Sequence, residues 1–114
     1  MEYALFSLPI VSGKSDAARR FLVDLEGPQK QAYAESERRL GITKEVWAIQ
    51  HTPGGDAFVV FFQGDDIAGA VGQFVASQDE FDQWFKGQVL NASGVDINHL
   101  PPGPLSEILS VYEA

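Results

Sequence analysis

The chain lacks cysteine and has only two histidines and one methionine among its 114 residues. Without cysteine it cannot form a disulfide, a thiolate zinc site or an iron–sulfur cluster, and it has no cysteine nucleophile. The two histidines, His51 and His99, stand far apart, and neither belongs to a His-x-x-x-His or similar metal-ligand motif. The sequence therefore predicts no metal site and no cofactor.

Long apolar runs are absent as well. A run such as residues 57–62 is far too short to cross a bilayer, which takes about 20 apolar residues. The first residues lack the basic segment and the long apolar core of a signal peptide. We expect a cytoplasmic protein with no membrane association.

Positive charge is scarce in the second half of the chain. Residues 51–114 contain one basic residue, Lys86, against nine acidic ones, whereas the charges of residues 1–50 balance. The net charge of −8 predicts no binding to the phosphate backbone of nucleic acids. The acidic half is either a solvated surface that aids solubility or a contact surface for a basic partner.

Apolar residues make up 45% of the chain. They follow two periodicities. Alternation predicts strands over residues 2–10 and 43–51, and a short apolar run predicts a strand over 57–63. A last strand is predicted over 107–112. Helical spacing predicts two long segments. The first follows residues 12–16, is interrupted at 26–28 and ends at Gly41; the second follows 64–66, restarts at 77–80 and ends at Gly94. An irregular, proline-rich connector spans residues 96–104.

This order of elements is β-α-β-β-α-β, which predicts a single α+β domain over residues 1–114. The expected architecture is a ferredoxin-like sandwich with four antiparallel strands and the helices on one face. The strand over 57–63 is apolar on both faces, and helices can cover only one of them. We therefore expect a homodimer formed through the open sheet face.

Several stretches spread over nearly the whole chain carry a resemblance to a known superfamily. They include Leu-Pro-Ile-Val-Ser-Gly-Lys (8–14), Glu-Ser-Glu-Arg-Arg-Leu-Gly-Ile-Thr-Lys-Glu (35–45), Val-Trp (46–47), Thr-Pro-Gly-Gly-Asp (52–56), Gly-Asp-Asp (64–66), Phe-Asp-Gln-Trp-Phe (81–85) and Gly-Val-Asp (94–96). The chain resembles the dimeric α+β barrel superfamily. More narrowly, it resembles an uncharacterised bacterial domain family related to antibiotic-biosynthesis monooxygenase-like domains. The resemblance implies a homodimer whose two sheets pack face to face. Haem-degrading members use a histidine in the second helical region, but residues 65–90 contain none, so the resemblance does not extend to haem.

Aromatic residues are the main candidates for a ligand pocket between the sheet and the helices. They either pack in the core or line such a pocket, and the candidates are Tyr33, Trp47, Phe61, Phe74, Trp84 and Phe85. Polar residues that could reach the pocket are Glu37, Arg38 and Asp66. Glu45 and His51 are the candidates for catalysis. A buried Glu45 could accept a proton if burial raises its pKa, or it could pair with Arg38 or Arg39.

Phosphate-binding and nucleophile motifs are not found. Gly13-Lys14-Ser15 lacks the preceding glycine of a phosphate loop, and no Gly-x-Ser-x-Gly sequence occurs. The leading hypothesis is a domain that binds a small apolar or aromatic molecule. A cofactor-independent monooxygenase acting on a flat aromatic substrate, which the resemblance implies, and a non-catalytic interaction protein are the alternatives.

Overall fold

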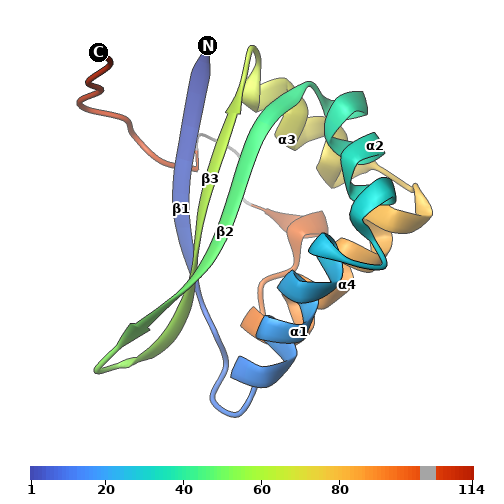
Figure 1. Ribbon diagram of the computed structural model, residues 1–114, viewed down its shortest axis with the longest axis vertical. Coiled ribbons are helices and arrows are strands. Elements are labelled where there is room, and N and C mark those ends of the chain that lie inside the picture. Colours follow the sequence, from blue (N-terminus) through green and yellow to red (C-terminus); the bar gives the residue numbers. More distant parts are fainter. Residues whose placement is uncertain (101–104) are drawn as a thin grey trace.

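A three-stranded antiparallel sheet forms the centre of the fold. The computed structural model describes residues 1–100 and 105–114. Its strands are β1 (Glu2–Pro9), β2 (Ile42–Thr52) and β3 (Gly55–Gly64), in the order β1-β3-β2. Four helices, α1 (Ser15–Glu26), α2 (Lys30–Leu40), α3 (Ile67–Ala76) and α4 (Glu80–Ser93), lie on one face of the sheet (Figure 1). The predicted α+β class, with its helices on one face, is confirmed.

The helix ends follow the local sequence. Gly41 and Gly94 adopt left-handed backbone conformations with φ of 79° and 76° and end α2 and α4, a conformation that suits glycine. The side chains of Asp66 and Asp79 accept backbone N–H groups at the starts of α3 and α4. The predicted interruption near Gly27 separates α1 from α2. Within the described ranges, no helix combines the length and apolarity needed to span a bilayer.

The central strand, β3, has apolar side chains on both faces. Phe58 and Val60 point toward the helices and are completely buried. Phe6 of β1 and Trp47 of β2 lie opposite Val60 on either side, so one row of side chains crosses all three strands beneath the helices. Because side chains alternate along a strand, the register places Trp47 on the helical face of the sheet.

An aromatic cluster fills the space between the sheet and the helices. Phe21 of α1, which is 1% exposed, meets the rings of four residues edge-on at centroid distances of 5.0–6.3 Å: Trp47, Phe58, Trp84 and Phe85. Edge-to-face packing of this kind adds to the stabilisation from apolar burial. The cluster fixes α1 and α4 over the middle of the sheet.

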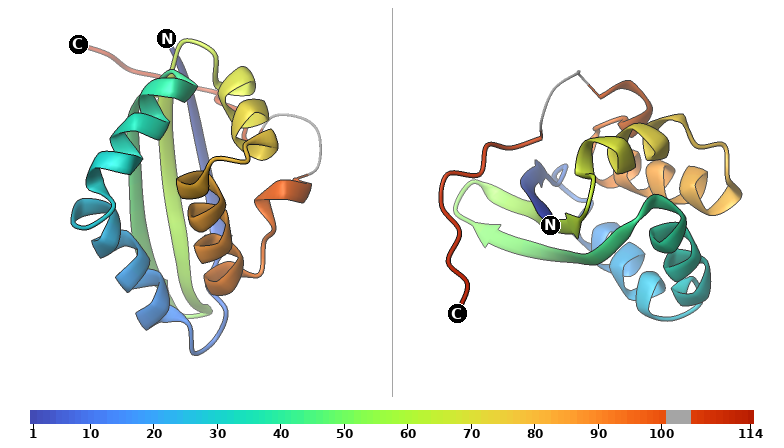
Figure 2. Two further views of the ribbon diagram at one scale, coloured as in Figure 1. Left: turned by 90° about the vertical axis from the view of Figure 1, so that its right-hand side faces the viewer. Right: turned by 90° about the horizontal axis from the view of Figure 1, so that it is seen from above.

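The predicted fourth strand over residues 107–112 is wrong. Residues 105–114 are irregular and pass beyond β1 on the side away from the helices (Figure 2). The Leu5 N–H of β1 donates to the Ser106 Oγ at 3.1 Å. This bond uses a side-chain oxygen of Ser106 where a neighbouring strand would use a backbone carbonyl. Residues 105–114 therefore form no strand beside β1. The predicted connector over 96–104 begins with the short 3₁₀ helix η1 (Ile97–His99), and its last part, residues 101–104, lies outside the described residues.

Candidate functional site

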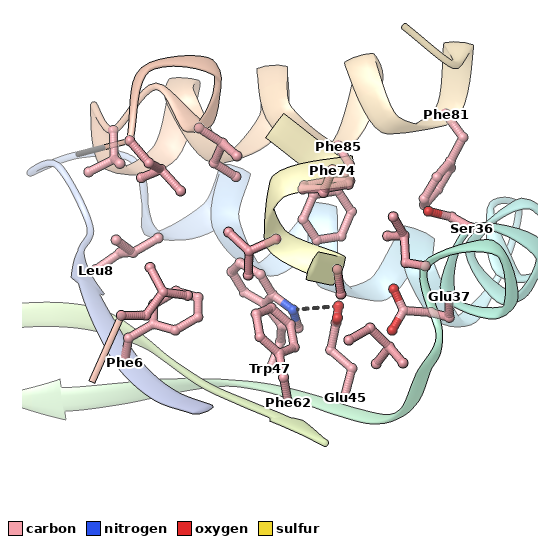
Figure 3. A pocket seen from close by; sticks show the side chains of 18 residues that line it. Phe6, Leu8, Ser36, Glu37, Glu45, Trp47, Phe62, Phe74, Phe81 and Phe85 are labelled. Carbon is pink, nitrogen blue, oxygen red and sulfur yellow. Dashed lines mark hydrogen bonds between the residues drawn. The ribbon is translucent and has the colours of Figure 1, made fainter. Parts of the chain in front are cut away.

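A cavity of about 100 Å³ lies between the sheet and helices α2, α3 and α4. Its walls are almost wholly apolar and come from the inward faces of all three strands, from α2, α3 and α4, and from residues that follow α4. Prominent among them are Phe6, Leu8, Trp47, Phe62, Phe74 and Phe85. Figure 3 shows Phe6 and Leu8 at one end of the cavity and the carboxyl groups of Glu37 and Glu45 at the other. The cavity is therefore an apolar chamber with one polar end.

The polar end is built by Glu37 of α2 and Glu45 of β2. One carboxyl oxygen of Glu45, Oε2, accepts hydrogen bonds from the Tyr33 hydroxyl at 2.5 Å and from the Trp47 indole N–H at 2.9 Å. The Oε2 atom of Glu37 is fully buried and has no hydrogen-bond partner among the described residues. Glu45 is thus anchored to the protein, whereas Glu37 keeps an unsatisfied polar atom, which is uncommon in a folded protein.

Both carboxyl groups hold protons more tightly than usual. Burial, followed by the charge of Glu45 and a hydrogen bond with it, raises the pKa of Glu37 to about 10. Burial also raises the pKa of Glu45, although the hydrogen bonds from Tyr33, Glu37 and Trp47 oppose this change. Two carboxylates that approach each other away from water cannot both ionise easily. The pair therefore shares at least one proton at neutral pH.

A second, more open depression of about 230 Å³ lies on the outer side of the carboxyl pair. Glu37, Ile42 and Glu45 line both this depression and the inner cavity. The other residues of the depression come from α1, α2 and β2 and include Lys30 and Lys44. The two carboxyls consequently lie between the apolar cavity and the open surface depression.

A buried polar network holds α2 in place, and with it Glu37. Asp82 of α4 is completely buried and accepts hydrogen bonds from the Ser36 hydroxyl at 2.6 Å, the Ser77 hydroxyl at 2.6 Å and the Arg39 guanidinium at 3.0 Å. Nearby, the ammonium group of Lys86 donates to three backbone carbonyls at the end of α3. A fully satisfied network of this kind rigidifies the elements that it joins.

Of the six aromatic pocket candidates, four line the cavity or the outer depression, and two do not. Phe74 is one of the four and lines the cavity. Trp47 and Phe85 line the cavity, while Tyr33 lines the outer depression and bonds to Glu45. Phe61 lies on the opposite face of the sheet, beside Tyr3, because its position in β3 has the opposite parity to Phe58 and Val60. Trp84 packs between Phe21 and Phe81 and is not part of the cavity wall.

Three of the polar candidates lie away from the cavity. Arg38 is exposed, and Asp66 caps α3, so neither reaches the cavity. His51 lies at the exposed end of β2, where its ring bonds to Asp56 at 2.7 Å. The expected pairing of Glu45 with Arg38 or Arg39 is wrong, because the Glu45 carboxyl meets Tyr33, Trp47 and Glu37 instead, and Arg39 bonds to Asp82.

Some residues of the site were not singled out by the sequence. Phe6 and Phe62 line the cavity. The sequence could have indicated this, because Phe6 lies two residues from Leu8 and Phe62 two residues from Val60, and residues two apart in a strand share one face of the sheet. Asp82 lies in the first turn of α4 between Phe81 and Gln83, where acidic residues are common on helix surfaces, so no local pattern marks it as buried. Among the described residues, no three histidine, aspartate or glutamate side chains gather closely enough to hold a metal ion.

Comparison of the chain with protein-family models, with curated proteins and with solved structures gives no significant match. The interpretation of the site accordingly depends on its own geometry and chemistry.

Proposed function

We propose that the protein binds a compact, largely apolar small molecule in the cavity between the sheet and helices α2, α3 and α4. The observation that carries this proposal is the combination of apolar walls with one polar end, formed by Glu37 and Glu45. Binding sites for small molecules commonly have this composition, in which apolar walls supply affinity and a few polar groups fix orientation.

The size of the cavity limits the ligand. An apolar cavity of about 150 Å³ holds a benzene molecule, and the cavity here is about 100 Å³. Because this space is smaller, a single ring fits only if the walls move. A short branched chain of up to about five carbons, with its polar group directed toward Glu37 and Glu45, matches the space better.

Trp47 offers a direct readout, because its indole ring lines the cavity and the chain has one other tryptophan. In a Trp84→Phe variant, Trp47 is the sole tryptophan. Toluene, 3-methylbutan-1-ol and 3-methylbutan-1-amine should each be titrated while the emission of Trp47 and the melting temperature are followed. Native mass spectrometry of the purified protein would reveal a molecule that it carries already.

The matched variants are Val71→Phe and Val23→Phe. Val71 lines the cavity, so a larger side chain there should block the probes, whereas Val23 is 62% exposed on α1 and should not affect them. The proposal is refuted if no probe changes the emission of Trp47, or if Val71→Phe binds the probes as the parent does.

The same proposal includes a ferredoxin-like homodimer formed through the open sheet face. Supporting it, Leu5, Phe61 and Val46 form a row across the three strands on this face, and Leu5 and Val46 are each 45% exposed. A contiguous apolar surface of this kind is typical of protein contacts. Val46→Lys should convert a dimer to a monomer in analytical ultracentrifugation, while Val23→Lys should not. A monomeric parent protein at micromolar concentration would refute the dimer.

A cofactor-independent oxygenase is a second candidate, supported by the proton-sharing carboxyls at the end of the cavity. In that function Glu45 would take a proton from a bound phenol. His51 would have no part, because it lies at the exposed end of β2. Oxygen consumption with small phenols, abolished in Glu45→Gln and retained in His51→Ala, is the expected result. Absence of oxygen uptake with every phenol that binds would exclude this candidate.

A further inference from the structure

The polar end of the cavity contains two carboxyl groups without a positive partner. Within the described residues, no lysine, arginine or histidine nitrogen lies within ion-pair distance of Glu37 or Glu45. The nearest protein donors, Tyr33 and Trp47, are neutral and both bond to the same oxygen of Glu45. The buried Oε2 of Glu37 accepts no hydrogen bond from the described residues, and the one bond assigned to this carboxyl group is the bond within the pair, to Glu45.

The wider surroundings of the pair are acidic as well. Asp82 of α4, although it is paired with Arg39 of α2, adds to the negative potential at Glu37, and Glu26 of α1 adds to that at Tyr33. The positive groups on this side, Lys30 and Lys44, line the outer depression rather than the inner cavity. A ligand that enters the cavity thus meets carboxyl oxygens and no cationic side chain among the lining residues, an arrangement that favours a cation over a carboxylate or phosphate.

The walls beside the carboxyls are suited to a cation with an apolar body. Aromatic rings of Trp47, Phe62, Phe74 and Phe85 line the cavity, and aromatic faces attract ammonium groups. An ammonium group provides three N–H donors, which could satisfy the free oxygen of Glu37 and the remaining acceptor capacity of Glu45. A neutral alcohol provides one donor and no charge.

We propose that the cavity binds a compact primary amine, with its ammonium group held between Glu37 and Glu45 and its carbon skeleton among the aromatic walls. This inference rests on the proposed function and specifies its ligand class. Since the empty pair retains a proton, ammonium binding should release up to one proton from it. Binding should consequently strengthen as the pH rises from 6 to 8, a range in which an alkyl amine stays protonated.

Three probes with one carbon skeleton test the proposal: 3-methylbutan-1-amine, 3-methylbutan-1-ol and 3-methylbutanoate. Affinity should be measured by calorimetry and by the emission of Trp47, in two buffers with different ionisation enthalpies so that proton release is detected. A hydrogen bond to a charged group is stronger than a neutral one. We expect the amine to bind at least about tenfold more tightly than the alcohol, and the acid to show no binding.

Variants at the carboxyl pair provide a second test of the amine proposal. Glu37→Gln keeps the shape of a protonated glutamate but cannot become an anion. It should weaken the amine at least about tenfold and abolish proton release, whereas the alcohol, which carries no charge, should weaken much less than the amine. Glu35→Gln on the exposed side of α2 is the matched control and should change neither.

The outcomes separate the two proposals. Equal or tighter binding of the alcohol, or amine binding that is unchanged in Glu37→Gln, overturns the assignment of an amine and leaves a neutral-ligand pocket. Failure of all three probes, together with toluene, to change the emission of Trp47 overturns the pocket itself.

Discussion

Replacement of Glu37 by glutamine should make the protein more stable, and the gain should grow with pH. A carboxyl whose pKa is raised in the folded state makes its full contribution to stability below the pKa of the unfolded chain. That contribution is lost as the pH rises toward the folded value. For Glu37 the window extends from about 4.5 to about 10. The parent should therefore lose stability across the neutral range, whereas Glu37→Gln has no proton to lose.

The magnitude follows from the linkage between protonation and folding. When the folded protein retains one proton that the unfolded chain has lost, the unfolding free energy falls by at most about 1.4 kcal/mol for each unit that the pH rises. Glu37 is only half-buried, so water reduces this slope. Between pH 5.5 and 8.5 we expect the stability of Glu37→Gln relative to the parent to grow by about 1–3 kcal/mol.

Urea unfolding at pH 5.5, 6.5, 7.5 and 8.5 would measure this difference. The other titratable groups are present in both proteins, so their contributions to the difference cancel. Glu35→Gln, which removes one exposed carboxylate from the same helix, corrects for the change in net charge. A stability difference that does not change with pH, or an equal change in Glu35→Gln, would show that Glu37 is ionised like a surface residue.

Three further outcomes are expected. Asp82→Ala should lower the unfolding free energy in urea by about 2–4 kcal/mol, because buried hydroxyls lose their acceptor and a space opens; a loss as small as that of the exposed Asp65→Ala would contradict this. Lys86→Met should cost about 1–3 kcal/mol, since carbonyls at the end of α3 lose their donor, and amide exchange should quicken near residues 74–77; unchanged exchange would count against it. Val71→Phe should raise the melting temperature, since an empty cavity of this size costs about 2 kcal/mol; a decrease would indicate overpacking.

Local sequence determined most of the secondary structure. Alternating apolar residues identified β1 and β2, because successive side chains of a strand face opposite ways. A short apolar run identified β3 as a central strand. Gly41 and Gly94 marked the ends of helices, since each takes a left-handed conformation that other residues adopt with strain. The same patterns predicted a strand over 107–112, where the structure has none. Alternation shows that a segment could pair but not that a partner edge receives it.

The site depended on tertiary structure to a greater degree. The sequence included Glu37 and Glu45 among its polar candidates, but it gave equal standing to Arg38, Asp66 and His51. Composition could not separate them, because an exposed cap and a buried acid are the same residue types. What decided the matter was packing. The parity of β2 directs Glu45 inward beside Trp47, and the Asp82 network sets α2 so that Glu37 lies against Glu45. Burial and proximity, which arise only when α2 and β2 come together, turn two ordinary glutamates into a proton-sharing pair.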